Sequence, residues 1–174
     1  PDVRPMPQPD DRGVSHDELT GRIERAEGSL VYLNGWGKYG DGDGEFHHPS
    51  GIAVDGEGNV YVTDVWYHDD MWDHRIQVFD PEGRFLRKWS NEGAAAGEFD
   101  YCWGLAIDRE GNVYVTDPLN HRIQVFDLEG RFLREWGKYG DGDGEFDFHQ
   151  AIAVDGEGDV YVTDVGNHRI QVFD

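Results

Sequence analysis

The residues that could take part in chemistry are histidines, aromatic residues and one cysteine, set in short variable stretches between recurring phrases. Three stretches follow a Gly-Glu-Phe phrase: residues 47–50 (His-His-Pro-Ser), 100–103 (Asp-Tyr-Cys-Trp) and 147–150 (Asp-Phe-His-Gln). A fourth, residues 66–72, reads Trp-Tyr-His-Asp-Asp-Met-Trp. Aromatic side chains supply contact area for a ligand and histidines orient its polar groups, whereas imidazole and thiolate are also zinc ligands. The two chemistries to weigh are ligand recognition and metal-assisted catalysis.

These stretches belong to an internal repeat. The phrase His-Arg-Ile-Gln-Val-Phe-Asp begins at three positions that are 47 residues apart, His74, His121 and His168. The Gly-Glu-Phe phrase recurs at residues 44–46, 97–99 and 144–146. Its first interval is 53 residues because the first repeat carries six extra residues between Asp64 and Asp73. Without them the period is 47 throughout, which is typical of a repeat architecture.

Each repeat holds four short segments with the composition of β-strands. In the second repeat they are residues 104–108, 113–117, 122–127 and 131–136. Val-Tyr-Val-Thr and Ile-Gln-Val-Phe are β-branched and aromatic with period two, and the connectors contain the Gly and Asn that tight hairpins require. A repeated four-stranded antiparallel unit predicts an all-β fold, the β-propeller, with three blades in this chain.

The same phrases resemble the NHL-repeat family. They are Gly-Ile-Ala-Val-Asp (residues 51–55), Gly-Asn-Val-Tyr-Val-Thr-Asp (111–117) and Asn-His-Arg-Ile-Gln-Val-Phe-Asp (120–127), and the likeness spans about residues 31–174. The resemblance implies propeller blades of four antiparallel strands, commonly six to a ring. It makes this chain half, or a fragment, of a six-bladed propeller.

The domain limits follow from the repeats. Residues 1–14, polar and rich in proline, are expected to form a flexible lead-in, and residues 15–28 begin with a capping box at Ser15 and Glu18 that predicts a short helix. Residues 29–37 align with a fourth strand, with Trp36 opposite Trp136. The blades are expected at residues 44–90, 97–137 and, without a fourth strand, 144–174.

Three blades cannot close a ring, which leaves two interpretations. We favour the first, in which the chain is a piece of a longer propeller. In the second, two copies form a homodimer that closes a six-bladed ring, and the N-terminal strand of each completes the last blade of the other.

Most of the recurring polar residues are expected to be structural. Asp55, Asp108 and Asp155 end the first strand, where a carboxylate accepts turn amides. The second-strand aspartates are expected to pair with the third-strand arginines: Asp64 with Arg75, Asp117 with Arg122, and Asp164 with Arg169. The recurring histidines His74, His121 and His168 are expected to pack between blades. The Gly-Asp-Gly-Asp-Gly-Glu stretches at residues 40–45 and 140–145 lack the spacing of an EF-hand and are interpreted as acidic linkers.

Composition limits the partners. Fifteen basic against 36 acidic residues give a formal charge of −21, which disfavours nucleic acids and anionic membranes. A single cysteine, Cys102, excludes an intrachain disulfide and a cysteine-cluster zinc site. The compartment stays open, with a secreted, periplasmic or cell-surface location favoured, and no cofactor is expected.

The predicted function is non-catalytic binding of a protein, peptide or small ligand through one loop face. Because variable aromatics and histidines on a rigid scaffold are typical of recognition surfaces, the predicted contacts are His48, Trp66, Tyr67, Trp72, Trp103, His149 and Gln150. Neutral variation among the repeats is the competing explanation.

The alternative function is a metal-dependent lyase or hydrolase whose site is completed by further blades. The chain resembles the peptidyl-hydroxyglycine amidating lyases in its blades. That resemblance implies zinc-binding histidines at Ser50, Trp103 and Gln150, where this chain has none. His48, Cys102 and His149 would have to converge instead.

Overall fold

The computed structural model describes residues 32–68, 71–89 and 92–174, with only the backbone for residues 66–68 and 71–73. The chain divides into two compact units, residues 1–34 and 35–174. Of the first unit only residues 32–34 are described, and they form no strand or helix. The expected lead-in (1–14) and helix (15–28) lie outside the described residues. Within the described residues, no helix has the length and apolar character to span a membrane.

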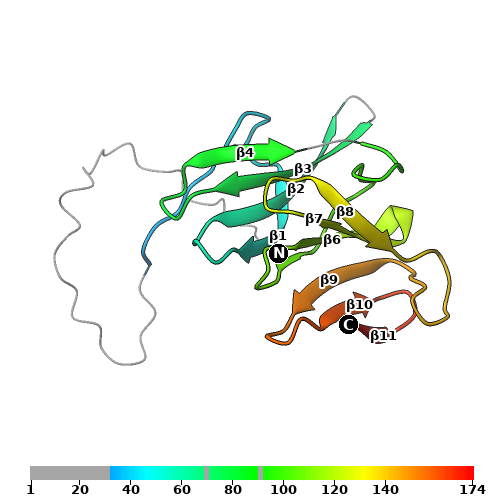
Figure 1. Cartoon of the computed structure of the whole chain (residues 1–174). Helices are drawn as coiled ribbons and strands as arrows, with labels where there is room; N and C mark the ends of the chain where they lie inside the picture. The colour runs from blue at the N-terminus through cyan, green and yellow to red at the C-terminus, as the bar shows by residue number, and fades with distance from the viewer. Residues whose placement is uncertain (1–31, 69–70, 90–91) are drawn as a thin grey trace, which may run out of the picture. The chain divides into compact units, whose positions relative to one another are not determined.

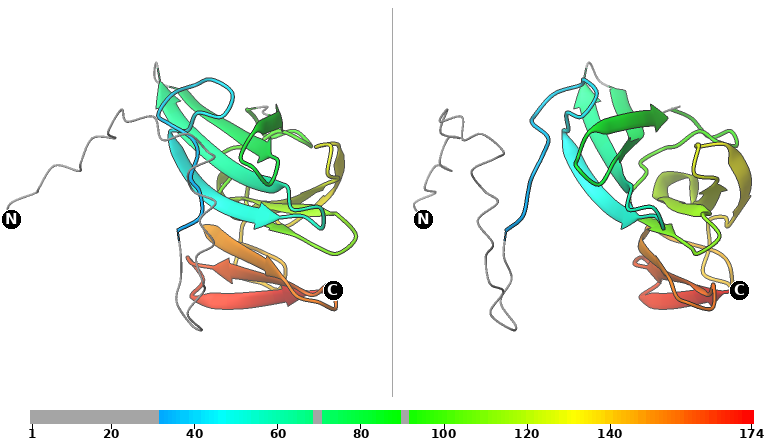
Figure 2. Two further views of the ribbon diagram at one scale, coloured as in Figure 1. Left: turned by 90° about the vertical axis from the view of Figure 1, so that its left-hand side faces the viewer. Right: turned by 60° about the vertical axis from the view of Figure 1, so that its left-hand side comes forward.

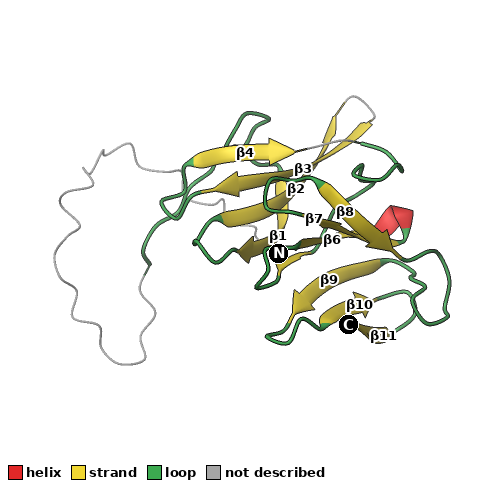
Figure 3. Cartoon of the chain, viewed as in Figure 1, coloured by secondary structure: helices red, strands yellow, loops and turns green. Residues whose placement is uncertain are grey.

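The described residues form three antiparallel sheets that follow one another along the chain (Figures 1 and 3). Blade 1 has the order β1 (His48–Val54), β2 (Val60–His68), β3 (Met71–Phe79) and β4 (Phe85–Trp89). Blade 2 has β5 (Leu105–Ile107), β6 (Val113–Asp117), β7 (Arg122–Phe126) and β8 (Phe132–Trp136), with a short 3-10 turn, Pro118–Asn120, between β6 and β7. Blade 3 has β9 (His149–Val154), β10 (Val160–Asp164) and β11 (Arg169–Phe173). The predicted all-β fold of propeller blades is confirmed.

The second and third strands of every blade pair in one register. In each, the second-strand aspartate lies opposite the third-strand arginine: Asp64 and Arg75, Asp117 and Arg122, Asp164 and Arg169. The six-residue insertion in blade 1 continues this ladder to His68 opposite Met71. The insertion therefore lengthens a β-hairpin, whereas the sequence suggested a loop.

The blades pack side by side in chain order (Figure 2). Their first strands β1, β5 and β9 are neighbours. One apolar cluster joins blade 1 to blade 2, and includes Tyr61, Ile76, Leu105 and Val115. A second joins blade 2 to blade 3, and includes Tyr114, Ile123 and Val162. These two cores thus lie between blades, because a single twisted sheet cannot bury its own faces.

A buried polar network fixes the linker that precedes each blade. Arg75 is 1% exposed, binds Asp64 at 2.8 Å, and donates to the carbonyl oxygens of Asp41 (2.6 Å) and Glu45 (2.8 Å). Gln77 donates to the same Glu45 carbonyl and accepts the Gly44 amide. The network recurs in the other blades, through Arg122, Gln124, Glu98, Arg169, Gln171 and Glu145. The predicted aspartate–arginine pairs are confirmed, and the glycine-rich stretches have a structural role.

Trp36 takes the place of a fourth-strand tryptophan, although residues 32–37 are not assigned as a strand. Its ring lies over Gly83, where a Cβ atom would come within 2.7 Å, and its centroid is 5.9 Å from that of Phe79. Trp89 makes the same contacts with Gly130 and Phe126 of the next blade.

Candidate binding site in the start loops

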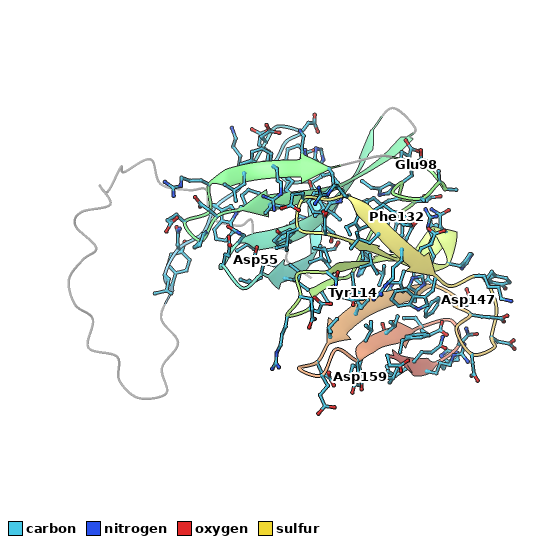
Figure 4. The ribbon with its side chains drawn as sticks, viewed as in Figure 1. Asp55, Glu98, Tyr114, Phe132, Asp147 and Asp159 are labelled. Atoms are coloured by element: carbon cyan, nitrogen blue, oxygen red, sulfur yellow. The ribbon has the colours of Figure 1, made fainter. Side chains whose placement is uncertain are left out.

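The loops that start the blades, residues 47–50, 100–103 and 147–150, are called the start loops. Because His48 of β1 lies opposite Val65 of β2, the first start loop and the β2–β3 hairpin occupy the same end of blade 1, as predicted. Figure 4 shows Glu98, just before the second start loop, and Asp147, the first residue of the third, at one end of the blades. Asp55 and Asp159, in the turns between first and second strands, lie at the other end.

An open cavity of about 510 Å³ lies in this face between blades 1 and 2. It is lined by residues of two start loops and one strand: His47, His48, Pro49, Ser50, Val65, Tyr101 and Trp103. Most of these residues occupy positions at which the three repeats differ, whereas the flanking phrases hardly change.

One wall of the cavity is aromatic. The rings of Tyr101 and Trp103 stack with centroids 5.4 Å apart and planes 21° from parallel. Tyr101 has a left-handed backbone (φ 75°), and its amide donates to Nε2 of His74 over 3.1 Å. A non-glycine residue in this region stores backbone strain, and such residues often cluster at ligand sites. The strain is held in place by the buried histidine of the preceding blade.

The other wall is held by the second strand of blade 1. One carboxylate oxygen of Asp64 accepts the amides of both His47 and His48, at 2.9 Å each. The hydroxyl of Thr63 accepts the Gly51 amide and donates to the carbonyl of Trp103 over 2.7 Å. The loops that carry the cavity are therefore fixed to a rigid scaffold, which is the usual construction of a binding surface.

Comparison with known proteins places these blades in a family. The NHL repeat profile matches residues 46–79, 99–126 and 150–173, one segment in each sheet. The chain belongs to the NHL-repeat family. Similar proteins include the B-box type zinc finger protein ncl-1 of Caenorhabditis elegans, 45% identical over 56 residues, and protein brain tumor of Drosophila melanogaster, 33% identical over 89 residues.

Those alignments cover 32% and 51% of the NHL chain but only 6% and 8% of the two relatives. The chain therefore spans less than a tenth of each. Among solved structures, virginiamycin B lyase from Staphylococcus aureus is similar with a TM-score of 0.48 and 18% identity, over 73% of this chain and 41% of that one. A gluconolactonase from Xanthomonas campestris has a TM-score of 0.47 and 17% identity, over 71% and 46%. No activity is carried over from either structure.

The structure brings two of the predicted contact residues together in the NHL chain. His48 is exposed, Trp103 is half-buried, and both line the cavity from different blades. Trp66, Tyr67 and Trp72 lie in the extended β2–β3 hairpin, where Tyr67 is opposite Trp72. Their side chains lie outside what the structure describes, so their part in binding stays a prediction.

His149 belongs to the interior and is not a surface contact. Its side chain is fully buried, and Nε2 donates to the carbonyl of Arg122 in the preceding blade over 2.8 Å. Burial lowers its pKa to about 4, because the charged imidazolium loses hydration there. Gln150 is half-buried, and its carbonyl accepts the Thr116 hydroxyl. Neither residue lines the cavity of blades 1 and 2.

The residues proposed for an alternative metal site do not converge. Cys102 is fully buried, with Sγ 3.9 Å from the carbonyl oxygen of Arg75, and burial raises the pKa of its thiol. It occupies the position of His149 in its own blade, and both residues contact the arginine of the blade before. In the part of the chain with described side chains, no group of three or more His, Cys, Asp or Glu residues is arranged to hold a metal ion.

Sequence reasoning passed over five of the seven cavity residues: His47, Pro49, Ser50, Val65 and Tyr101. Tyr101 stands at the same position as the predicted contact His48, one repeat later, and this alignment could have indicated it. Val65 is the first residue of the insertion, and a valine at this place is typical of the interior of a strand. Its residue type therefore gave no indication that it lines a cavity.

Proposed function

We propose that this NHL chain is a binding module that holds an apolar side chain of a protein or peptide partner in the cavity between blades 1 and 2. The observation that carries the proposal is the stacked Tyr101–Trp103 wall facing a fixed loop of His48, Pro49 and Ser50. Rigid aromatic walls bury a large area of a ligand at low entropic cost, which is why they dominate binding hot spots.

The charge near the cavity favours a basic partner. Asp41 binds Nε2 of His47 at 2.5 Å and has 76% of its side chain exposed, and Asp100 beside Tyr101 has 48% exposed. The whole chain carries a formal charge of −21. Lysine or arginine residues on either side of the apolar anchor would therefore be attracted during encounter and in the complex. This preference also agrees with the expected exclusion of nucleic acids.

The alternative of a metal-dependent lyase or hydrolase has no support of this kind. The recurring carboxylates, arginines and glutamines hold linkers and turns, and the cavity is lined by residues 47–50, by Val65 and by two aromatic rings. No observation in the described residues favours a reaction over binding.

The test is titration of the ¹⁵N-labelled chain with the peptide Lys-Lys-Gly-Leu-Gly-Lys-Lys, following the indole N–H signal of Trp103. We expect that signal to shift with saturation. A peptide with Ala in place of Leu should bind about tenfold more weakly, because the anchor is lost. Replacing the lysines with glutamates should abolish binding at low salt.

Tyr101→Ala and Phe148→Ala form a matched pair for this test. The two residues share one repeat position and a left-handed backbone, but Phe148 lies in blade 3 and outside the cavity. Tyr101→Ala should weaken binding about tenfold or more, and Phe148→Ala should leave it unchanged. Equal effects of the two variants, or a titration that leaves the Trp103 signal in place, would refute the proposed site.

A further inference from the structure

Blade 3 exposes a face that the other two blades bury. Tyr161, Ile170 and Val172 are 39%, 60% and 53% exposed. We call these three residues the trailing face. Their counterparts in the preceding blades are at most 3% exposed, because the following blade covers them: Tyr61, Ile76, Val78, Tyr114, Ile123 and Val125.

Blade 1 exposes the face that blades 2 and 3 pack against the blade before them. Ile52 and Val54 in β1 are 65% and 57% exposed, and we call them the leading face. Leu105, the counterpart of Ile52 in blade 2, is 5% exposed against blade 1. Ile152 of blade 3 packs against the cluster of blade 2. The chain therefore carries both halves of an apolar contact that it forms twice internally.

The polar groups of the two faces match as well. At each internal interface a threonine hydroxyl donates to a start-loop carbonyl of the next blade, from Thr63 to Trp103 at 2.7 Å and from Thr116 to Gln150 at 2.9 Å. Thr163, the third of the series, has its described hydrogen bonds only with Ala151 of its own blade. The acceptor that would continue the series is the carbonyl of Ser50, in the start loop just before the leading face.

The edge of β11 adds a third element. β3 and β7 are paired along both edges, with Ile76 opposite Trp89 and Ile123 opposite Trp136. Among the described strands β11 pairs only with β10. By repeat position the residue that belongs opposite Ile170 is a fourth-strand tryptophan, and Trp36 already stands against blade 1 as such a tryptophan does. An open strand edge of this kind is a template for strand addition.

We infer that the trailing face of one copy of this chain binds the leading face of a second copy. In this contact Tyr161, Ile170 and Val172 cover Ile52 and Val54, the Thr163 hydroxyl donates to the Ser50 carbonyl, and Trp36 lies opposite Ile170 of β11. The occupant is a second copy because each face has the residues with which the other is covered inside the chain. If two copies use both faces, the contact forms twice and the pair is closed.

Charge opposes this association and provides a first check. Each copy carries a formal charge of −21, so the approach of two copies is repulsive over a distance that salt shortens to about 10 Å at 0.1 M. Apolar contacts are not weakened by salt. The association should therefore become tighter as the salt concentration rises.

The experiment is the solution mass of the 174-residue chain by sedimentation equilibrium, over a range of protein concentrations at 0.1 and 0.5 M salt. We expect a concentration-dependent rise from 19.8 kDa to about twice that mass. Ile170→Glu and Ile52→Glu, each placing a charge in one face, should each raise the dissociation constant at least tenfold. Leu133→Glu is the control, since Leu133 is 50% exposed in β8 of the blade that has neighbours on both sides.

A mixture of the two face variants tests the head-to-tail arrangement. Ile170→Glu keeps an intact leading face and Ile52→Glu an intact trailing face, so an equimolar mixture should form a one-to-one complex that neither variant forms alone. Circular dichroism and the unfolding midpoint establish that both variants are folded. A wild-type chain that stays at 19.8 kDa at every concentration overturns the inference. So does association that the face variants leave intact, or a mixture without complex.

Discussion

The side-chain oxygen of Thr116 lies 2.9 Å from the carbonyl oxygen of Gln150, so that a hydroxyl of blade 2 holds the start loop of blade 3. The same oxygen accepts the amide of Gly104 at 2.7 Å. One fully buried side chain thus fixes the start of its own blade and the start of the next. The Thr116 hydroxyl therefore links the start of blade 2 to the start of blade 3.

Thr116→Val should therefore destabilise the chain more than Thr163→Val. The first substitution leaves the buried Gly104 amide and the partly buried Gln150 carbonyl without this partner, at a cost of up to about 1–3 kcal/mol each in similar cases. The second removes contacts only within blade 3. Urea unfolding of the two variants at a low protein concentration measures the difference. Equal losses would mean that the contact between blades adds nothing to stability.

Asp159→Asn should stabilise blade 3. In blades 1 and 2 the corresponding residues, Asn59 and Asn112, donate a side-chain hydrogen bond to the turn aspartate, at 2.9 and 2.7 Å. In blade 3 this position is Asp159 (Figure 4), a second carboxylate residue whose backbone amide donates to the Asp155 carboxylate over 3.1 Å. The substitution supplies a donor and removes a like charge, so the unfolding midpoint should rise by a few degrees. Asn59→Asp should lower it by a similar amount in the converse experiment.

Stability should fall in mildly acidic solution because of His149. Burial lowers its folded-state pKa from 6.5 to about 4, so the unfolded chain takes up a proton at a pH where the folded chain does not. The contribution of neutral His149 to the free energy of unfolding is complete above about pH 6.5. It is lost as the pH falls toward 4, and the loss amounts to roughly 3 kcal/mol.

His149→Cys is the variant that checks this dependence, because blade 2 has Cys102 at the same position. The variant should show a flatter free energy of unfolding between pH 6.5 and 4, measured by urea titration at several pH values. An unchanged slope would assign the acid sensitivity to other groups.

Trp103→Ala should leave the fold in place. Trp103 is half-buried and its ring is stacked on one side by Tyr101, so the expected loss is about 1 kcal/mol. Phe99→Ala is the comparison, since Phe99 is fully buried in the interface of blades 1 and 2 and should cost about 3–5 kcal/mol. If thermal unfolding shows similar losses, Trp103 is a core residue and its assignment to a binding wall is wrong.

The parts of the fold that could be predicted from the sequence are those that every repeat shares. The strands of blade 2 were predicted to within two residues, and the aspartate–arginine pairs and the turn aspartates were identified, because the same residue types recur at the same spacing. A residue type that recurs at one repeat position indicates that its surroundings recur as well. A polar residue that recurs in a buried strand indicates a hydrogen-bond or ion-pair partner.

The candidate site was predicted only in part because variation between repeats has two physical causes. His48 and Trp103 vary at exposed or half-buried places, where a change alters the surface. His149 varies with Cys102 and Pro49, but its place is an interior position against the preceding blade. The sequence alone does not show which residues surround a variable position, and so it does not show whether that position is buried. His149 was therefore predicted to be a surface residue. The extended hairpin was hidden for a related reason, since an insertion has no second copy with which to compare its pairing.

The attachment of each linker to the blade that follows it has a consequence for protein engineering. Arg75, Arg122 and Arg169 bind carbonyls that precede their own first strand and the second-strand aspartate of their own blade, and Arg122 also binds Glu135 of the fourth strand. The charge of these arginines is therefore neutralised within one contiguous segment from linker to fourth strand. A cut made just after the fourth-strand tryptophan separates none of these arginine–aspartate pairs. Arrays with added, deleted or reordered blades should therefore be assembled by joining segments at that position. The contacts to be matched at each new junction are the apolar contact, the threonine hydrogen bond and the other hydrogen bonds between blades, such as that of His149 with the Arg122 carbonyl.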